Sequence, residues 1–446
     1  MELYENGSAE AAPAPVTAST RRRAIVAASI GNAVEWYDYT VYGYLAATLG
    51  VIFFPSTDPT ASILASFAAF ALAFIVRPIG GIVFGSIGDR IGRQKTLAAV
   101  VILISVATFV TGLLPGYASI GVAAPVLLVL LRIIQGLSAG GEVGGAVVFL
   151  AEYAPAHRRG FQVGWVNMSA LPGAFAGAVF VTVLSATLSQ EEMVTWGWRV
   201  PFLLALPLGL IGLYLRLKVE DTPEFRALVA AGEHTGSPLR ETVKGNVRGI
   251  TLCLALTTMH AAGFYMVLTY IPTYLATVHN FERGSALVMM MIALGIAIAV
   301  IPITASLSDR IGRRPVVAAA CIGYILLAYP IFVLMSSGDT GSVILSQVLL
   351  GLLFGTFSGA PFAAMIELFA TRVRYTAFSI GYNISIALFG GTTPMISVWL
   401  VAITGIDVAP ALILIAAGVV SLVAVSLIPE TARLPLGSLG SVGRST

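Results

Sequence analysis

The sequence predicts an all-α membrane protein with twelve transmembrane helices in two six-helix bundles. Three observations lead to this prediction: an apolar composition, twelve long apolar runs, and a charged motif that occurs once in each half of the chain. Of the 446 residues, 57% are hydrophobic and only 11% are charged, whereas about 25% are charged in a typical soluble domain. A chain of this composition needs lipid as the solvent for most of its surface.

Twelve apolar runs give the number of helices. A helix needs about 20 apolar residues to cross the hydrocarbon core of a bilayer, and glycines and prolines are tolerated within such helices. The runs lie at residues 24–54, 62–87, 97–115, 124–153, 162–187, 197–217, 248–278, 285–308, 315–335, 343–368, 374–401 and 407–429.

The basic residues are concentrated in alternate loops between these runs. One set of loops, together with the termini, holds 21 of the 25 Lys and Arg residues, and the opposite set holds only Arg199 and Arg283. The other two, Arg77 and Arg132, lie inside helices. The positive-inside rule places the basic set in the cytoplasm. This alternation requires an even number of spans, so both termini are expected on the cytoplasmic side of the plasma (inner) membrane.

The longest charged connection, residues 218–247, divides the chain into two halves. We expect six-helix bundles over residues 22–217 and 248–430, a disordered cytoplasmic tail over residues 1–21 and a short cytoplasmic tail over residues 431–446. The halves share a repeat, because the sequence of Asp89–Arg93 recurs 220 residues later as Asp309–Arg313. Parallel repeats of this size are typical of transporters whose halves rock around a site near the bilayer midplane.

The segment Gly85-x-x-x-Asp89-Arg90-x-Gly92-Arg93, with its second copy, resembles the loop signature of the major facilitator superfamily. The resemblance covers about residues 22–435 and implies the major facilitator fold. Within the superfamily the chain resembles the metabolite:proton symporters, whose members carry proline, betaine, citrate, 2-oxoglutarate or shikimate; its first two helices and the segment 265–275 look closest to the proline/betaine transporters. The other segments that carry this resemblance are Gly31-Asn32-x-x-Glu35-Trp36-Tyr37-Asp38-Tyr39, Arg77-Pro78-x-Gly80-Gly81, Gln135-Gly136-x-x-x-Gly140-Gly141-Glu142, Trp196-Gly197-Trp198-Arg199-x-Pro201-Phe202, and Arg374-Tyr375-Thr376 with Tyr382-Asn383.

The first predicted helix carries two carboxyl groups one turn apart, Glu35 and Asp38. Together with Asn32, Tyr39 and Tyr42 they occupy an arc of roughly 120° on one face of the helix. Two carboxyl groups this close do not both ionise readily in a low-dielectric site, so one of them is expected to bind a proton. We predict proton coupling by this pair, with Asn32 and Tyr42 binding substrate. The alternative is that both acids only form ion pairs with arginines of other helices.

The fourth predicted helix carries Arg132, Gln135 and Glu142 within about 80° of one another around its axis. Arg132 and Glu142 are about 15 Å apart along that axis, so each needs a partner on another helix or a place beside a wet cavity. Ionisable groups inside a membrane indicate function. Glu142 is therefore a third candidate for proton coupling, and Gln135 is a candidate for substrate binding.

The two arginines inside helices, Arg77 and Arg132, have two interpretations. A buried guanidinium group suits bidentate binding of a carboxylate, and every candidate substrate of the resembling branch has one. The alternative is a counter-ion for Glu35, Asp38 or Glu142. Both hold in succession if the substrate displaces an internal carboxylate.

The two copies of the loop motif contribute a predicted cytoplasmic gate. The resemblance implies that such loops latch the cytoplasmic side and open as the halves rock, whereas the alternative is that their charges only fix topology. The gate residues are Asp89, Arg90, Arg93, Asp309, Arg310 and Arg313.

The second half offers Tyr265, Tyr382 and Asn383 as further candidates for substrate binding. Aromatic faces suit a betaine-like cation, although tyrosines also serve as interface and packing residues in membrane proteins. His260 has two interpretations as well, a core histidine or a proton carrier.

We therefore predict a proton-coupled symporter that imports a small organic solute by alternating access, with a zwitterionic osmolyte such as proline or betaine as first candidate. A symporter of small carboxylates is the second candidate, and a non-transporting membrane sensor on the same fold is the alternative from another class. The expected partners are the solute, the proton and membrane lipid.

An ATP-driven pump or a membrane enzyme is not expected. The sequence contains no Gly-x-x-x-x-Gly-Lys-Ser/Thr phosphate loop, no nucleophile elbow and no His/Cys ligand cluster. We therefore predict no catalytic residue, no metal and no cofactor. The dispersed basic residues do not indicate nucleic-acid binding.

Overall fold

The computed structural model describes residues 17–232 and 238–436. Most of the predicted N-terminal tail and of the C-terminal tail lies outside the described residues. Helix α1 begins at Ala18, so residues 18–21 are helical and not part of a disordered tail. The structure is helical along its length, and ten of its helices are long and apolar enough to cross a membrane. The apolar α20, with 17 residues, and α1, which carries Glu35 and Asp38, are not among these ten.

The first half of the chain forms its long helices close to the predicted runs. A short π turn leads into the sixth run and a break near Leu204 divides it, while 3-10 and short helical turns join other helices. The elements are α1 (Ala18–Phe53), α2 (Pro59–Ile91), α3 (Arg93–Leu113), α4 (Tyr117–Ile120), α5 (Ala123–Tyr153), η1 (Ala156–Arg158), α6 (Arg159–Thr187), α7 (Gln190–Glu192), η2 (Met193–Gly197), α8 (Arg199–Leu203) and α9 (Ala205–Leu217).

The predicted linker contains two short helices, α10 (Pro223–Ala230) and α11 (Pro238–Gly245). In the second half, two long helices each pass through a π turn, which adds one residue to a helical turn and often marks a functional position. The elements are α12 (Val247–Tyr265), η3 (Met266–Tyr270), α13 (Ile271–Thr277), α14 (Arg283–Ile311), α15 (Arg313–Ser336), α16 (Thr340–Ser358), α17 (Pro361–Ile366), α18 (Arg374–Ser385), η4 (Ile386–Gly390), α19 (Thr393–Thr404) and α20 (Ala411–Leu427).

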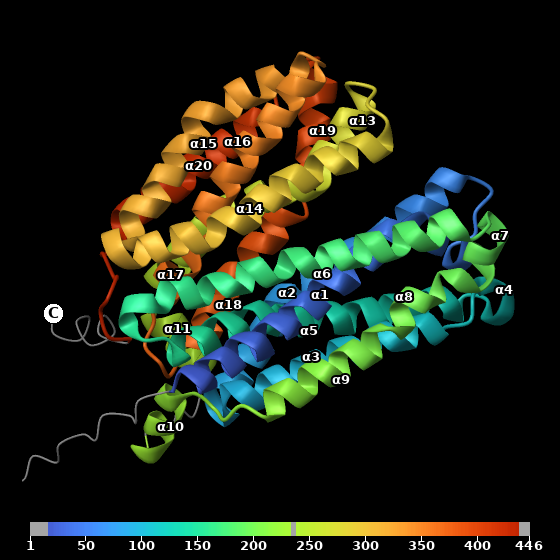
Figure 1. Cartoon of the computed structure of the whole chain (residues 1–446). Coiled ribbons are helices and arrows are strands. Elements are labelled where there is room, and N and C mark those ends of the chain that lie inside the picture. The colour runs from blue at the N-terminus through green and yellow to red at the C-terminus, as the bar shows by residue number, and fades with distance from the viewer. Residues whose placement is uncertain (1–16, 233–237, 437–446) are drawn as a thin grey trace, which may run out of the picture.

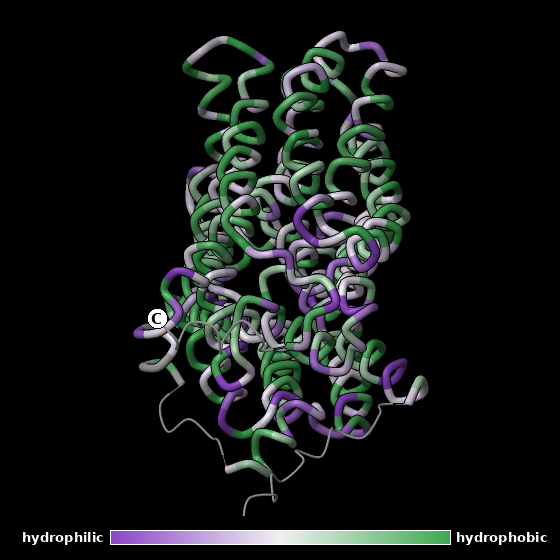
Figure 2. The backbone as a smooth tube through the Cα atoms, turned by 90° about the vertical axis from the view of Figure 1, so that its left-hand side faces the viewer, coloured by the Kyte–Doolittle hydropathy of each residue, from purple (hydrophilic) through white to green (hydrophobic). Residues whose placement is uncertain are grey.

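The helices of each half of the chain gather in a group of their own, as Figure 1 shows. The groups meet toward one end, where α2 and α5 pack on α18 and α6 packs on α14 and α17. They separate toward the end that carries α7 and α13. Hydrophobic residues cover most of the length of the helices, and hydrophilic residues are more frequent near the end where the groups meet (Figure 2). We call this the loop-motif end, since both copies of the charged motif lie there.

The glycine of each loop motif has a structural reason. Gly92 and Gly312 end α2 and α14 at φ angles of 112° and 113°, a region that only glycine adopts readily. A Cβ atom on Gly92 would lie 1.9 Å from Oδ2 of Asp221. The motif therefore turns the chain sharply into the next helix, in the same way in both halves.

Two glycines of α5 let this helix pack closely against α2. A Cβ atom on Gly136 would lie 2.2 Å from the carbonyl oxygen of Ala73, and one on Gly140 would lie 2.1 Å from that of Arg77. Backbones this close leave no room for a side chain. The contact holds Arg77 and Arg132, which belong to these two helices, at fixed positions relative to α1.

Candidate functional site

Besides the pairs that Arg93 makes at the loop-motif end, three buried ion pairs lie among the helices of the first half. Arg77 on α2 lies 2.6 Å from Glu35 on α1, and Arg132 on α5 lies 3.2 Å from Asp38 on α1. Glu142 on α5 pairs with Arg216 at the end of α9 through both carboxylate oxygens. All six side chains are buried. A buried charge that is paired is tolerated, whereas the same charge alone is very unfavourable.

The Glu35 carboxylate is bound through one oxygen only. Its Oε1 accepts a hydrogen bond of 2.6 Å from Arg77, while its Oε2 is buried without a hydrogen-bond partner among the described residues. Arg77 donates a second, longer bond of 3.4 Å to the carbonyl oxygen of Ala139. Its guanidinium carbon lies 5.4 Å from the Tyr39 ring and 5.8 Å from the Phe74 ring.

The Asp38 carboxylate is bound through both oxygens. Oδ1 accepts hydrogen bonds from Thr108 on α3 at 2.9 Å and from Gln135 on α5 at 3.1 Å, and Oδ2 accepts one from Arg132 at 3.2 Å. The Arg132 guanidinium carbon lies 3.7 Å from the centre of the Tyr42 ring. This network joins three helices of the first half and gives both Asp38 oxygens hydrogen-bond donors.

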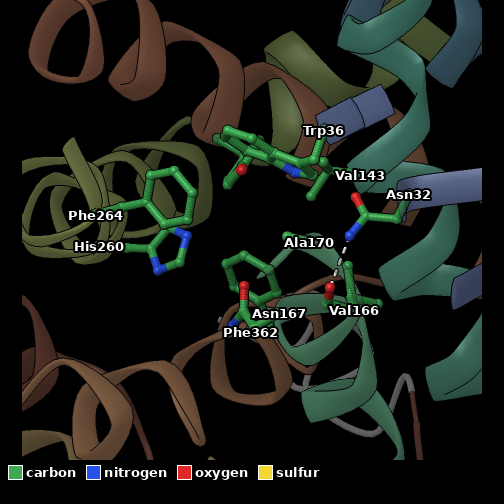
Figure 3. A pocket seen from close by; sticks show the side chains of 10 residues that line it. Asn32, Trp36, Val143, Val166, Asn167, Ala170, His260, Phe264 and Phe362 are labelled. Atoms are coloured by element: carbon green, nitrogen blue, oxygen red, sulfur yellow. Dashed lines mark hydrogen bonds between the residues drawn. The ribbon is translucent and has the colours of Figure 1, made fainter. Parts of the chain in front are cut away.

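A small cavity lies at the interface between the two halves, formed by α1, α5 and α6 on one side and α12, α17 and α18 on the other. In Figure 3, Phe264 and His260 point into it from one side, and Asn32, Trp36 and Val143 lie on the other. Its walls contain no Asp, Glu, Lys or Arg; the ten residues are Asn32, Trp36, Val143, Val166, Asn167, Ala170, His260, Phe264, Phe362 and Tyr382.

Four aromatic rings and one imidazole ring dominate the walls of this cavity. The Trp36 and Phe264 ring centres are 4.6 Å apart, across the interface of the halves, and those of Phe362 and Tyr382 are 5.6 Å apart. His260 lies 5.0 Å from Phe362, and its Nδ1 has no hydrogen-bond partner among the described residues. The side-chain oxygen of Asn32 also lacks such a partner. The cavity therefore combines ring faces with a few polar atoms.

The loop motifs close the loop-motif end by joining the two halves. The Asp89 carboxylate accepts hydrogen bonds from the backbone of Tyr375 (3.3 Å) and Thr376 (3.0 Å) and from the Thr376 hydroxyl (2.7 Å). The Asp309 carboxylate accepts bonds of 2.8 and 2.9 Å from the backbone of Gly160 and Phe161. Each aspartate thus caps the first turn of a helix in the opposite half, where the helix dipole favours a negative charge.

Two glutamates extend this closure. Glu152 pairs with Arg93 of its own half at 3.3 Å and with Arg374 of the other half at 2.8 Å. In the same arrangement, Glu367 pairs with Arg313 at 3.2 Å and with Arg159 at 2.7 Å. The predicted gate residues Arg90 and Arg310 are exposed at the surface instead.

A family model described as the Major Facilitator Superfamily matches residues 28–391. This chain belongs to the major facilitator superfamily. The family assignment confirms the resemblance seen in the loop motifs, and the all-helical fold agrees with it.

Three relatives are similar to this chain over most of its length. The chain is 40% identical to the glycine betaine/proline/ectoine/pipecolic acid transporter of Dickeya dadantii, over 93% of this chain and 84% of that protein. It is 39% identical to the proline/betaine transporter of Escherichia coli K12, over 93% of this chain and 85% of that one. A putative proline/betaine transporter of Staphylococcus aureus is 36% identical, over 93% and 89%.

Solved structures show the same fold. A proton:xylose symporter bound to 6-bromo-6-deoxy-D-glucose superposes with a TM-score of 0.80 at 19% identity, over 95% of this chain and 99% of that chain. The xylose transporter of E. coli in an inward-open conformation gives a TM-score of 0.64 at 18% identity, over 94% and 98%. The fold of this superfamily member is thus closer to the first of these two structures.

Two of the predicted substrate-binding residues, Asn32 and Tyr382, line the cavity, together with His260. Arg77, Arg132, Gln135 and Tyr42 belong to the ion-pair networks beside it. Asn383 joins α18 to α5 through a bond of 2.7 Å to the carbonyl oxygen of Gly140. Tyr265 packs near Phe74 with ring centres 5.9 Å apart. The sequence analysis did not select Trp36, Asn167, Phe264 and Phe362 as site residues, although Trp36 is part of a quoted motif.

Arg216 is one of the 21 basic residues counted with the loops and termini, although the predicted bundle over residues 22–217 includes it. The structure places it in α9, buried, where it pairs with Glu142 and also donates to the carbonyl oxygens of Ala27 and Leu97. The numbers of predicted intramembrane acids and bases could have indicated this pairing. Three carboxyl groups were predicted inside the membrane but only two arginines, so a third base was needed.

Proposed function

We propose that this chain is a proton-coupled symporter that imports a zwitterionic osmolyte, such as proline or glycine betaine, by alternating access. The protein is a transporter and not an enzyme. The named relatives transport proline and betaine, and the solved structures of similar fold include a proton symporter.

The observation that carries the choice of solute is the cavity without charged walls between the halves. A quaternary or secondary ammonium group is attracted to the faces of aromatic rings, and four such rings surround the cavity. A zwitterion brings no net charge into it. A di- or tricarboxylate would need arginines that are free to bind it, but Arg77 and Arg132 are paired with Glu35 and Asp38. The same geometry therefore disfavours the small-carboxylate alternative.

The topology that fits this function has twelve spans in two six-helix bundles. Adding α1 and α20 to the ten helices that meet the criteria for crossing a membrane gives this number. The start of α1 and the end of α20 then lie at the loop-motif end, and the positive-inside rule places that end in the cytoplasm of the cell, with the protein in the inner membrane. Membrane lipid surrounds the exposed apolar side chains.

The conformation fits one state of the transport cycle. Hydrogen bonds and ion pairs join the halves between the loop motifs and the level of the cavity. In the proposed orientation the cytoplasmic side is closed, so solute and proton enter from outside. Rocking of the halves then separates Asp89 and Asp309 from the helices they cap and releases both ligands inside.

Transport is best tested by uptake into proteoliposomes of radiolabelled proline, glycine betaine, citrate and 2-oxoglutarate, with and without an inward proton gradient. We expect gradient-dependent accumulation of proline or betaine and none of the two carboxylates. Accumulation of citrate or 2-oxoglutarate instead would reject the zwitterion assignment. Binding without any transport would support a membrane sensor, and gradient-independent equilibration would indicate an uncoupled facilitator.

A further inference from the structure

The cavity between the halves has an unsatisfied polar atom on each side. Among the described residues that line it, Oδ1 of Asn32 and Nδ1 of His260 are buried without a hydrogen-bond partner. Asn32 belongs to α1 in the first half and His260 to α12 in the second, and the two residues are only 1% and 5% exposed. A buried polar atom without a partner is unfavourable. At a cavity wall, a bound solute can supply that partner.

The orientation of the Asn32 amide is fixed by its neighbours on α6. Its Nδ2 donates to the carbonyl oxygen of Val166 at 2.7 Å and to Oγ of Ser169 at 3.0 Å. The Ser169 hydroxyl donates its own hydrogen to the same carbonyl oxygen at 2.9 Å, so both neighbours act as acceptors toward Asn32. A flipped amide would place its oxygen against these two acceptors. The oxygen therefore stays on the other side, turned away from Val166 (Figure 3), where it can only accept a hydrogen bond.

These two side chains define which end of a zwitterion lies on which side. A carboxylate only accepts hydrogen bonds, whereas an imidazole ring can donate one, so the carboxylate suits His260 and not the oxygen of Asn32. The ammonium group is then left on the side of Asn32, where the ring of Trp36 also lines the cavity. His260 itself lies among rings, with Phe362 at 5.0 Å and Phe264 at 6.2 Å between ring centres.

We propose that Asn32 makes this transporter prefer zwitterions whose ammonium group carries an N–H bond, such as proline, over quaternary ones, such as glycine betaine. This inference rests on the proposed function and chooses between its two solutes. An ammonium N–H donates to Oδ1 of Asn32 and satisfies it. A quaternary ammonium group has only methyl or methylene groups to offer and leaves the buried oxygen unpaired, which weakens binding. The aromatic rings attract both kinds of cation, so they do not supply this discrimination.

Three solutes that differ only in methylation test this preference on the wild type. The ammonium group of proline carries two N–H bonds, that of N-methylproline one, and that of N,N-dimethylproline none. Affinity is measured by isothermal titration calorimetry on the purified full chain in detergent. We expect proline and N-methylproline to bind with affinities within a few-fold of each other, and N,N-dimethylproline to bind roughly 10- to 100-fold more weakly. A stepwise loss with each added methyl group would indicate a limit of size and would overturn the inference, as would equal binding of all three.

Three variants locate the source of the preference. Asn32→Leu has a similar shape without the oxygen, so we expect its affinity for proline to fall to that for N,N-dimethylproline. Ser169→Ala is the matched control, because it removes a contact on the nitrogen side of the same amide and leaves Oδ1 in place; we expect the preference to remain. His260→Leu is expected to weaken all three solutes by a similar factor, since each keeps its carboxylate. A preference that persists in Asn32→Leu, or disappears in His260→Leu, would overturn the inference.

The proposed function and this inference fail in different ways. Wild-type protein that neither binds the three solutes nor takes them up into proteoliposomes would overturn both. Gradient-driven uptake of proline and N,N-dimethylproline with equal KM would overturn the inference alone and leave the proposed function standing. If Asn32→Leu does not fold, as judged by size-exclusion chromatography, the methylation series on the wild type decides the inference by itself.

Discussion

The two halves of this transporter share a backbone plan and a loop motif but differ in the chemistry of their membrane cores. Besides the buried pairs of Arg93 with Asp89 and Glu152 at the loop-motif end, the first half buries three further ion pairs among its helices. In the described residues of the second half, the buried charged side chains are Asp309, Arg313, Glu367 and Arg374, all at the loop-motif end. The middle of the second half contributes Phe264, Phe362, Tyr382 and His260 to the cavity.

The comparison indicates a division of tasks that the repeat does not reveal. Both halves contribute equivalently to closing the loop-motif end, since each offers an aspartate to cap a helix of the other. The buried acids predicted to couple the proton lie in the first half, and three of the four aromatic rings around the cavity come from the second. In the proposed function, coupling between proton and solute therefore has to cross the interface of the halves.

The largest expected effect comes from breaking an ion pair of the first half. Arg216→Met leaves Glu142 buried and unpaired, which costs about 3–5 kcal/mol of stability, and we expect a large loss of thermal stability in detergent. The double variant Glu142→Gln/Arg216→Met removes both charges and is expected to recover most of that loss. A single variant as stable as the wild type would show that Glu142 is not held by Arg216.

The next effect concerns the aromatic walls contributed by the second half. Phe264→Leu keeps an apolar side chain but removes a ring face, a loss of about 1–2 kcal/mol of cation–π attraction. We expect KM for betaine uptake to rise roughly 5- to 30-fold with little change in stability. Phe332→Leu is the control, because Phe332 is also buried in the second half but packs on Tyr274, away from the cavity. Equal effects of both substitutions would remove the argument for the rings.

A smaller effect is expected at the loop-motif end, where an aspartate of each half caps a helix of the other. Asp89→Asn weakens the cap of α18, and caps contribute about 0.5–2 kcal/mol, so the closed population should fall. Ser379 lies at the interface of the halves beside Gly144, so a cysteine at position 379 can report on opening. In a protein with Cys253 and Cys321 replaced by alanine, we expect this cysteine to react several-fold faster with a maleimide from the cytoplasmic side when Asp89→Asn is present than when it is absent.

The matched control for this substitution is Asp339→Asn. Asp339 also caps a helix, accepting a bond of 2.9 Å from the backbone of Ser342, but it joins no residues of different halves. We expect no change in the reactivity at position 379. An unchanged reactivity in Asp89→Asn would mean that this aspartate does not hold the closed state.

The smallest expected effect is on the pH dependence of stability, and it concerns two carboxylates outside the membrane that cap helices. Glu430 accepts hydrogen bonds at the start of α15, and Asp221 does so at the start of α3. Burial opposes ionisation of Glu430, but four backbone N–H groups outweigh it and lower its pKa. At Asp221 burial outweighs the backbone N–H groups and raises the pKa. The two equivalent positions therefore respond to pH in opposite directions.

The sign of each contribution follows from these directions. Glu430 stabilises the fold above its ordinary pKa of 4.5, and this is lost as pH falls through its lowered value. The contribution of Asp221 is present at low pH and is lost as pH rises through its raised value. On acidification, Glu430→Gln should lose less thermal stability than the wild type, and Asp221→Asn should lose more. Parallel curves for all three proteins would contradict this difference.

The sequence predicts the helices well because these depend on local pattern. Apolar runs, basic loops and the repeated motif at Asp89 and Asp309 each report on a short segment. The partners of Arg132 and Glu142 were expected on other helices, and they lie there. Which partner each one takes was not predictable, because helical periodicity gives the face of one helix but not the helix that packs against it.

The cavity was harder to predict for the same reason. Trp36 and Phe264 are 228 positions apart in the chain, and only the packing of the two halves brings their rings together. Arg216 was misassigned because it stands at the end of an apolar run, where a loop arginine and a buried one look alike. Both errors arise where the two ends of a contact lie on different helices.

The proposed zwitterionic solute also determines which forces drive transport. A zwitterion carries no net charge across the membrane, so each cycle that moves one proton moves one elementary charge. Uptake is then electrogenic and responds to membrane voltage as well as to the pH difference. A potential of 100 mV, negative inside, supplies about 2.3 kcal/mol per cycle, which corresponds to a roughly forty-fold accumulation of solute even when the pH is equal on both sides.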